Sequence, residues 1–108
     1  MEQTQLLKGV LEIAVLAVLG NGETYGYDIL SRLEQAGLNG VGDASVYGTL
    51  RRLEQAGHLN SRLAASDSGP ARKYYTVTES GREAFRAGAE TWRRIERAVD
   101  LLMNEQQS

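Results

Sequence analysis

The sequence has no cysteine, and it has only one histidine, one proline and one tryptophan among its 108 residues. Without cysteine there can be no disulfide bonds, thiolate metal ligands or cysteine nucleophiles. The histidine, His58, follows a predicted helix and has no pair of carboxylates near it in the sequence, so the groups of hydrolytic or metal-dependent catalysis are missing. A phosphate-binding glycine signature is missing as well. We therefore expect a protein that is not an enzyme, with no metal site and no cofactor.

Long hydrophobic runs are also lacking. The longest one extends from Ile13 to Leu19, far short of the ~20 residues that a membrane-spanning helix needs. No charged and apolar leader with a cleavage site precedes it. We expect a cytoplasmic protein.

The length suits one compact unit and is too short for a catalytic domain with a regulatory one. Apolar residues make up 42% of the chain and charged residues 24%, so a core can offset the entropy lost on ordering. Within this unit we expect two parts, residues 1–78 and residues 79–108.

The net charge of −2 does not by itself favour a nucleic-acid partner, because neutralising phosphates requires lysine and arginine. The charges are unevenly distributed, however. Acidic residues dominate the two ends of the chain: Glu2, Glu12, Glu90, Glu96, Asp100 and Glu105. Basic residues gather in the middle: Arg51, Arg52, Arg62, Arg72 and Lys73. A basic patch on a mildly acidic protein remains compatible with DNA binding.

Three helices are predicted before residue 58. The first runs from Leu6 to Leu19, is apolar on most of its faces, and ends at the turn Gly20-Asn21-Gly22. The second begins with Thr24 as its cap and is stopped by Gly37. The third has Asp43 as its N-cap, continues to about Gln55, and is ended by Gly57.

Beyond the third helix the pattern changes to alternation, which predicts two strands. The alternating positions are Leu59, Ser61 and Leu63 in the first strand and Tyr75 and Val77 in the second. We expect a long hairpin with a loop over residues 66–71. Pro70 suits the exposed tip of this hairpin and would be unfavourable inside a central strand.

A long last helix is predicted to start at Thr78, with one apolar seam. The seam residues follow at steps of three and four: Phe85, Gly88, Trp92, Ile95, Val99 and Leu102. Its last part lies too far along the chain to be covered by its own domain alone. We expect both the first helix and a second subunit to cover it. A tryptophan at such a position more often belongs to the core of an interface than to a ligand site, and this is the expectation for Trp92.

The order of elements predicts a mainly α protein with a small β-hairpin: a winged helix-turn-helix with an N-terminal helix and a long C-terminal dimerisation helix. In this fold the third helix enters the major groove of DNA. Its apolar side holds Val46, Leu50 and Leu53, and its outward side is expected to hold Ser45, Gly48, Arg51 and Arg52, with Tyr47 at the flank. Arginine binds guanine or phosphate oxygens, hydroxyls donate to phosphates, and glycine permits close approach.

Arg72 and Lys73 would lie at the base of the wing, near flanking phosphates. A solvated surface remains an alternative for each basic pair taken alone. A winged helix used only for protein interaction is the alternative for the whole chain, although such an interface does not need basic residues on both helix and wing.

The chain resembles the PadR family of bacterial transcriptional regulators. The matching residues are Gly26-Tyr27, Tyr47, Leu53-Glu54, Gly57, Gly69-Pro70, Arg72-Lys73-Tyr74-Tyr75, Thr78 and Gly81. Two positions depart from the family pattern: Tyr25 replaces a common histidine, and Gly48 replaces the usual proline in the recognition helix. The resemblance covers almost the whole chain, roughly from Leu6 to Phe85.

The resemblance implies a homodimer that binds a palindromic operator in double-stranded DNA and represses neighbouring genes. The DNA-binding residues expected are Tyr27, Ser45, Tyr47, Gly48, Arg51, Arg52, Arg72, Lys73 and Tyr74. The dimer-interface residues expected are Leu6, Val10, Phe85, Trp92, Ile95, Val99 and Leu102. Some family members release DNA when an aromatic compound or another small molecule binds near the interface, and Trp92 is the candidate residue for stacking on such an effector.

Overall fold

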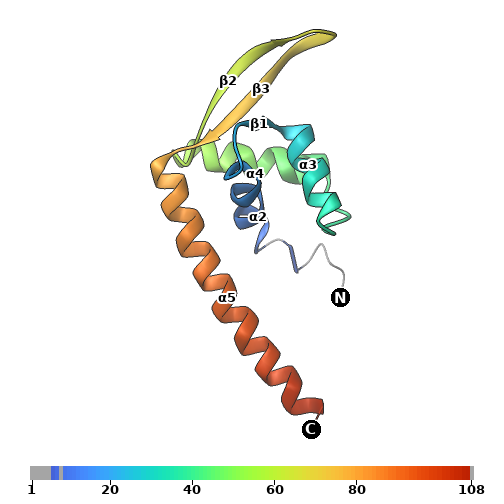
Figure 1. The fold of residues 1–108 in the computed structure, drawn as a ribbon, viewed down its shortest axis with the longest axis vertical. Helices are drawn as coiled ribbons and strands as arrows, with labels where there is room; N and C mark the ends of the chain where they lie inside the picture. The colour runs from blue at the N-terminus through green and yellow to red at the C-terminus, as the bar shows by residue number, and fades with distance from the viewer. Residues whose placement is uncertain (1–5, 8, 108) are drawn as a thin grey trace.

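The computed structural model describes residues 6, 7 and 9–107. Its elements, in chain order, are α2 (Leu11–Leu19), β1 (Thr24–Tyr25), α3 (Gly26–Gln35), α4 (Asp43–Gln55), β2 (Leu59–Ser66), β3 (Gly69–Val77) and α5 (Glu79–Gln107). Helices α2, α3 and α4 form a compact group, from which the hairpin β2–β3 projects on one side and α5 on the other (Figure 1). The predicted fold class, a winged helix with a long C-terminal helix, is confirmed.

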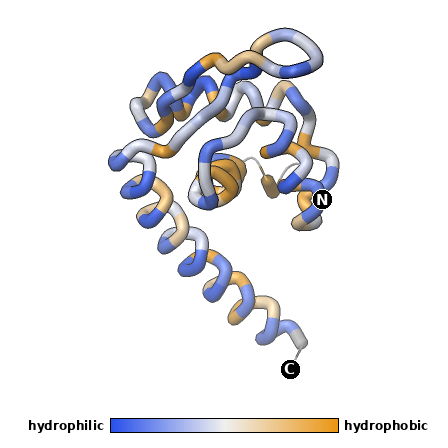
Figure 2. The backbone as a smooth tube through the Cα atoms, turned by 45° about the horizontal axis from the view of Figure 1, so that its top comes forward, coloured by the Kyte–Doolittle hydropathy of each residue, from blue (hydrophilic) through white to orange (hydrophobic). Residues whose placement is uncertain are grey.

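The first helix begins later than predicted. Leu6 and Leu7 are helical, a turn follows at Gly9 and Val10, and α2 starts only at Leu11. Glycine weakens a helix because its backbone loses more freedom on ordering than that of any other residue. The apolar character of α2 is as predicted, and the helix packs against α3, α4, α5 and β3 (Figure 2).

The predicted caps of α3 and α4 are each displaced. Thr24 lies in β1 and donates a hydrogen bond from Oγ1 to Asp28 Oδ2 over 2.6 Å, while Tyr25 occupies the N-cap position of α3. Thr24 is extended because it pairs with Tyr75 of β3. Gly42, and not Asp43, is the N-cap of α4, which leaves the Asp43 carboxylate in the first turn, where it still complements the helix dipole.

The sheet has three antiparallel strands in the order β1-β3-β2, so it contains one strand more than predicted. The two residues of β1 are too few to show an alternating pattern. The predicted loop over 66–71 is wrong, since Ser66 pairs with Gly69 and the strands are joined by a short turn. Pro70 lies inside β3, at a level where only β2 flanks that strand.

The hairpin extends well past the helices, which explains why its outer half has no core (Figure 1). Leu59 is buried, as the alternation predicts, whereas Leu63 on the same strand is 72% exposed. The alternating pattern therefore identifies the strand correctly but overstates how much of it is covered.

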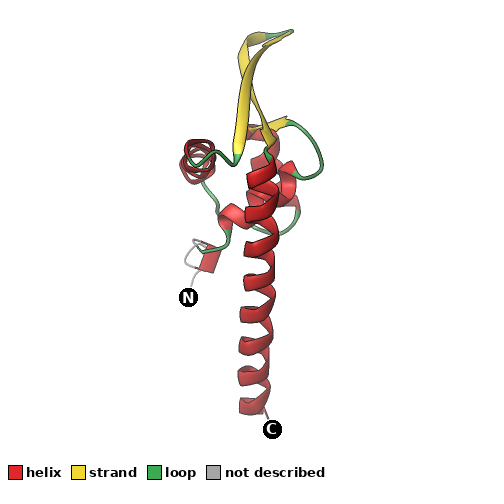
Figure 3. Ribbon diagram, turned by 90° about the vertical axis from the view of Figure 1, so that its left-hand side faces the viewer, coloured by secondary structure: helices red, strands yellow, loops and turns green. Residues whose placement is uncertain are grey.

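The start of α5 is confirmed at Thr78. The Thr78 Oγ1 accepts a hydrogen bond from the Gly81 amide over 3.1 Å and donates one to the Gly57 carbonyl over 2.7 Å. At Gly88 the helix approaches α2 so closely that a Cβ would lie 3.0 Å from Ile13 Cγ1. Every described side chain from Glu90 onward is exposed, and α5 continues as one straight helix beyond the rest of the subunit (Figure 3).

We expect Gly81→Ala to destabilise the protein by about 1–3 kcal/mol, although alanine is the better helix former. A Cβ at this position would lie 2.2 Å from the backbone oxygen of His58, so the junction between α5 and β2 must shift. The measurement is urea-induced unfolding followed by circular dichroism.

Gly48→Ala in α4 is the matched control. The nearest atom to its added Cβ is the mobile Arg52 Nη1 at 3.7 Å, so we expect stabilisation by roughly 0.5–1 kcal/mol. If Gly81→Ala and Gly48→Ala changed the free energy of unfolding equally, the close packing at Gly81 would not be the reason for glycine at that position.

Candidate nucleic-acid interface

Helix α4 turns one apolar side inward and one polar side outward. Val46, Leu50 and Leu53 are buried, as predicted. At about 100° per residue, the positions opposite this buried side are those of Ala44, Gly48, Arg51 and Gln55. Arg51 is exposed, and it forms no ion pair with any residue that the structure describes. It is therefore the cation that α4 presents most directly to a partner.

Arg52 is exposed too, but it is turned toward α2 and away from the outward side of α4. Its Nε lies 3.6 Å from Glu12 Oε1, and its Nη2 donates to Thr49 Oγ1 over 3.2 Å. Ser45 lies on the same flank, because at about 100° per residue the seven positions between Ser45 and Arg52 bring the two within about 20° of each other. Arg51 and Arg52, which the sequence predicts together on the outward face, lie on different sides of α4.

Tyr47 lies on the opposite flank of α4, facing the hairpin. It packs against Gly26, where an added Cβ would lie 2.5 Å from Tyr47 Cε1, so only glycine fits at the start of α3. Burial raises the pKa of the Tyr47 hydroxyl above its ordinary value of 10.0, and Tyr27 and Asp43 add to the increase. Tyr27 itself is 66% exposed. The tyrosine groove formed here is lined by Tyr25, Gly26, Tyr27, Tyr47, Ala71, Arg72 and Lys73.

Arg72 and Tyr74 point away from α4, because alternate residues of a strand face opposite sides. The Arg72 guanidinium lies 4.6 Å from the centre of the Tyr25 ring, and Tyr74 contacts the same ring edge-on at 5.4 Å. These contacts support Arg72 without neutralising it, since no ion pair of Arg72 occurs among the described residues.

Arg62 of β2 also lies on this outer face but has an acidic partner. It forms two hydrogen bonds with the Glu23 carboxylate, of 2.8 and 2.5 Å, and its guanidinium lies 5.3 Å from the centre of the Tyr74 ring. The hydrogen bond from Arg62 lowers the pKa of Glu23 below its ordinary value.

Lys73 faces the other way, toward α4. Its Nζ lies 3.1 Å from Glu54 Oε1, and the second oxygen of that carboxylate accepts a short hydrogen bond from Ser61 Oγ. The Ser61 hydroxyl, followed by Lys73, lowers the pKa of Glu54, and the bond to Glu54 raises the pKa of Lys73. Lys73 is thus paired within the subunit and is not the free cation that the sequence predicts beside the wing.

Three glutamates therefore determine which cations are left to bind an anion, and sequence reasoning missed all three. Glu12, Glu23 and Glu54 pair with Arg52, Arg62 and Lys73 respectively. Strand alternation would have separated Arg72 from Lys73, and the helical period would have separated Arg51 from Arg52. The identity of the glutamates depends on tertiary contacts, for which the sequence gives no direct signal.

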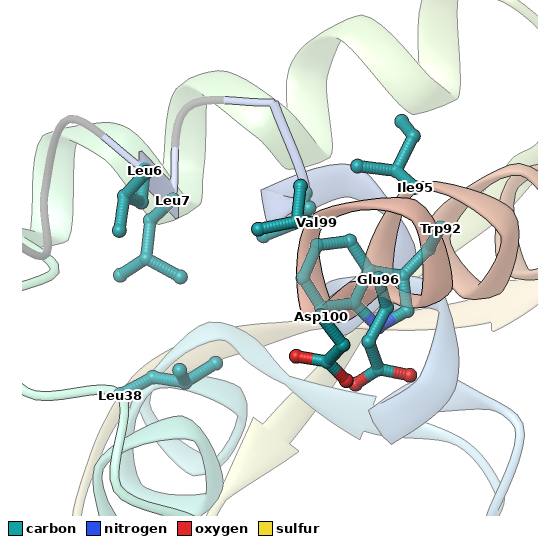
Figure 4. Close-up of a pocket in the computed structure, with 9 residues that line it drawn as sticks. Leu6, Leu7, Leu38, Trp92, Ile95, Glu96, Val99 and Asp100 are labelled. Carbon is teal, nitrogen blue, oxygen red and sulfur yellow. The ribbon is translucent and has the colours of Figure 1, made fainter. Parts of the chain in front are cut away.

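The residues expected at a dimer interface gather along α5 and near its contact with the N-terminal segment. Trp92, Ile95, Val99 and Leu102 are 40–60% exposed, and Leu6 is 65% exposed. Val10 and Phe85 differ from the others because they are half-buried against the subunit's own core. Figure 4 shows Leu6 and Leu7 facing Val99 and Trp92 across an apolar groove, with the carboxylates of Glu96 and Asp100 beside it.

His58 is partly buried, and its Nδ1 lies 2.8 Å from Ser80 Oγ. In the described residues no three histidine, cysteine or carboxylate side chains come together in a way that could hold a metal ion. Within the same residues, none of the helices combines the length and the apolarity that crossing a bilayer requires.

Three helices followed by a β-hairpin, with the polar side of α4 beside that hairpin, define a winged-helix protein of the kind that regulates transcription. The chain matches the Transcriptional regulator PadR-like family over residues 15–87, and it belongs to this family. The resemblance inferred from the sequence is confirmed. PadR regulators bind DNA, typically dimerise, and are not enzymes.

Solved structures of the family resemble this chain along nearly its full length. A PadR-like transcriptional regulator from Bacillus cereus strain ATCC 14579 is 34% identical, with a TM-score of 0.81 over 92% of this chain and 96% of that chain. A Streptococcus transcriptional regulator is 32% identical, with a TM-score of 0.80 over 92% and 97%. A PadR family regulator from Eggerthella lenta DSM 2243 is 30% identical, with a TM-score of 0.82 over 93% and 87%. No curated protein matches the sequence.

Proposed function

We propose that this protein acts as a homodimer that binds a palindromic operator in double-stranded DNA and represses transcription. Helix α4 enters the major groove and the hairpin β2–β3 lies beside it. The observation that carries the proposal is the exposure of two cations without ion pairs in the described residues: Arg51 on the outward side of α4, and Arg72 beside the tyrosine groove.

The expected DNA-contacting residues then divide into roles. Arg51 reaches base edges, and Gly48 allows the helix backbone to approach them. Hydroxyl groups of Tyr27, Tyr47 and Ser45 donate to phosphates, and Arg72 neutralises a phosphate next to the groove. Tyr74 positions Arg72 through the Tyr25 ring, while Arg52 exchanges its contact with Glu12 for a phosphate on the flank of α4.

The first test is fluorescence anisotropy with two duplexes across a salt series. One is selected by the wild-type protein from a random-sequence library, and the other is its scrambled counterpart. We expect the selected duplex to bind far more tightly, with log K against log salt falling at a slope near −5, the value for about six neutralised phosphates.

Two alanine variants in the same titration test the assignment of Arg51. We expect Arg51→Ala to weaken binding to the selected duplex by about 1–3 kcal/mol, because a base contact is lost. Arg97→Ala, on the exposed polar side of α5, is the control and should bind as the wild type does. If the wild-type protein binds neither duplex at low salt, it is a winged-helix protein-interaction module instead.

The dimer in this proposal is formed by α5. A second copy would cover the seam of Trp92, Ile95, Val99 and Leu102, together with Leu6 and Val10 of the N-terminal segment. The burial of such large apolar side chains is favourable by ~25 cal/mol per Å². Phe85 contributes indirectly, by fixing the start of α5 against the subunit core.

We expect Val99→Glu to raise the dimer dissociation constant about a hundredfold or more, because an unpaired charge in the seam costs about 3 kcal/mol. DNA binding should weaken in parallel. Sedimentation equilibrium measures the association, and Arg94→Glu on the opposite side of α5 is the control. A monomeric Val99→Glu protein that still binds the full operator tightly would contradict this arrangement.

We further propose that a small aromatic effector stacks on Trp92 and releases the protein from DNA. In the single subunit, before a second copy covers the seam, the apolar groove at Trp92 has a volume of about 440 Å³. Glu96 and Asp100 line the same groove, so the compound should be neutral or cationic, and aromatic acids should be repelled.

Trp92 is the sole tryptophan, so its fluorescence reports on this groove directly. We expect N-methylquinolinium to quench it at concentrations at least tenfold lower than 2-naphthoate, a bicyclic compound of opposite charge. The same cation should weaken binding to the selected duplex. Equal responses to both compounds, or to neither, would contradict an effector role for Trp92.

A further inference from the structure

The carboxylate of Glu54 connects three elements at the base of the wing. Glu54 lies in the last turn of α4, and its two oxygens bind one residue from each strand of the hairpin: Ser61 of β2 and Lys73 of β3. Lys73 also lies 5.5 Å from the centre of the buried Tyr75 ring, so its ammonium is held from two sides. The four residues form what we term the wing brace: Glu54, Ser61, Lys73 and Tyr75.

Among the described residues, the wing brace supplies the ion pair and the side-chain hydrogen bond between the hairpin and α4. Leu59 and Tyr75 anchor the base of the hairpin in the core, but Leu63, the residue paired with Lys73, is already largely exposed. A single partly exposed ion pair contributes little to stability. A carboxylate bound to two strands does, however, restrict the angle between the helix and the hairpin.

On β3, the strand that the wing brace holds, Arg72 directly precedes Lys73 and Tyr74 directly follows it. Because neighbouring residues of a strand face opposite sides, fixing Lys73 on the inner side also fixes Arg72 on the outer side. The wing brace therefore fixes the distance between the outward side of α4 and Arg72 through contacts within one subunit.

We propose that Glu54 is a positioning residue for DNA recognition, and that Lys73 serves to place the wing and does not neutralise a phosphate. The proposal rests on the function proposed above. It assigns the sequence discrimination of the protein partly to a carboxylate that touches no DNA. It also distinguishes Lys73 from Arg72, which the sequence presents as one basic pair.

The first test compares Glu54→Gln with the wild type on the selected and scrambled duplexes. We expect the ratio of the two affinities to fall about tenfold, with the salt slope unchanged. If Glu54 instead competed with phosphate for Lys73, both duplexes would bind more tightly, and the slope would steepen by about 1.8, the value for one additional phosphate in each subunit of the dimer. That result would overturn the proposal.

Three further variants separate positioning from a general effect of charge or folding. Glu54→Lys combined with Lys73→Glu restores the ion pair in reverse and should recover most of the affinity ratio. Ser61→Ala removes the contact with β2 without changing any charge and should lower the ratio in the same direction. Glu34→Gln, an exposed carboxylate on α3, should leave the ratio unchanged. Failure of the reversed pair to recover any of the lost ratio would count against the brace.

The second test measures the wing directly and needs no DNA. Because the chain has no cysteine, two can be introduced for spin labels, at the exposed Ala44 in the first turn of α4 and at Ser68 in the hairpin turn. Diluting labelled chains with unlabelled ones isolates the distance within one subunit. We expect a narrow distance distribution for the wild type, a broader one for Glu54→Gln, and a narrow one again for the reversed pair.

An unchanged distribution in Glu54→Gln would overturn the proposal even if DNA binding changed. The two tests also distinguish this proposal from the function on which it rests. If the wild type selected no duplex at all, the DNA-binding function would fail, whereas the spin-label distances would still decide whether Glu54 fixes the wing.

Discussion

The burial of α2 is the constraint on which the other elements depend. This helix is apolar on nearly every side, and α3, α4, α5 and β3 all pack against it. Its two consecutive residues Glu12 and Ile13 contact different helices: Glu12 contacts Arg52 of α4, and Ile13 contacts α5 at Gly88. A displacement of α2 would therefore move α4 and α5 together, because neither can move past a close-packed helix independently.

The acidic net charge of the protein is compatible with DNA binding because its carboxylates organise the cations around α4. Each of the three glutamates at this surface pairs with one basic side chain, which reduces the long-range attraction to any phosphate backbone. Non-specific affinity depends mainly on that attraction. A regulator that keeps few cations free binds random sequence weakly, so its contacts with base edges decide a larger share of the total affinity.

The sequence predicted the elements that have a strong period or a clear terminator. The burial of Val46, Leu50 and Leu53, the start of α5 at Thr78, and the ends of α3 and α4 at Gly37 and Gly57 all follow from local chemistry. The errors occur where tertiary contacts override local preference. Thr24 is drawn into β1 by pairing with Tyr75, and the hairpin pairs almost to its tip although Pro70 and Gly69 favour a loop. In the same way, the residue types of the candidate site were predictable, but which cations are paired depends on contacts between α2, α4 and the hairpin.

The length of α5 determines what the proposed dimer can recognise. Its 29 residues span about 44 Å at 1.5 Å per residue, and every described side chain from Glu90 onward is exposed in one subunit. An apolar seam on a straight helix aligns with a second copy along much of its length, which leaves few ways for the two subunits to tilt. Each recognition helix is joined to its own α5 through the rigid α2. The seam therefore fixes the separation of the two recognition helices, and with it the spacing of the operator half-sites, before either helix meets DNA.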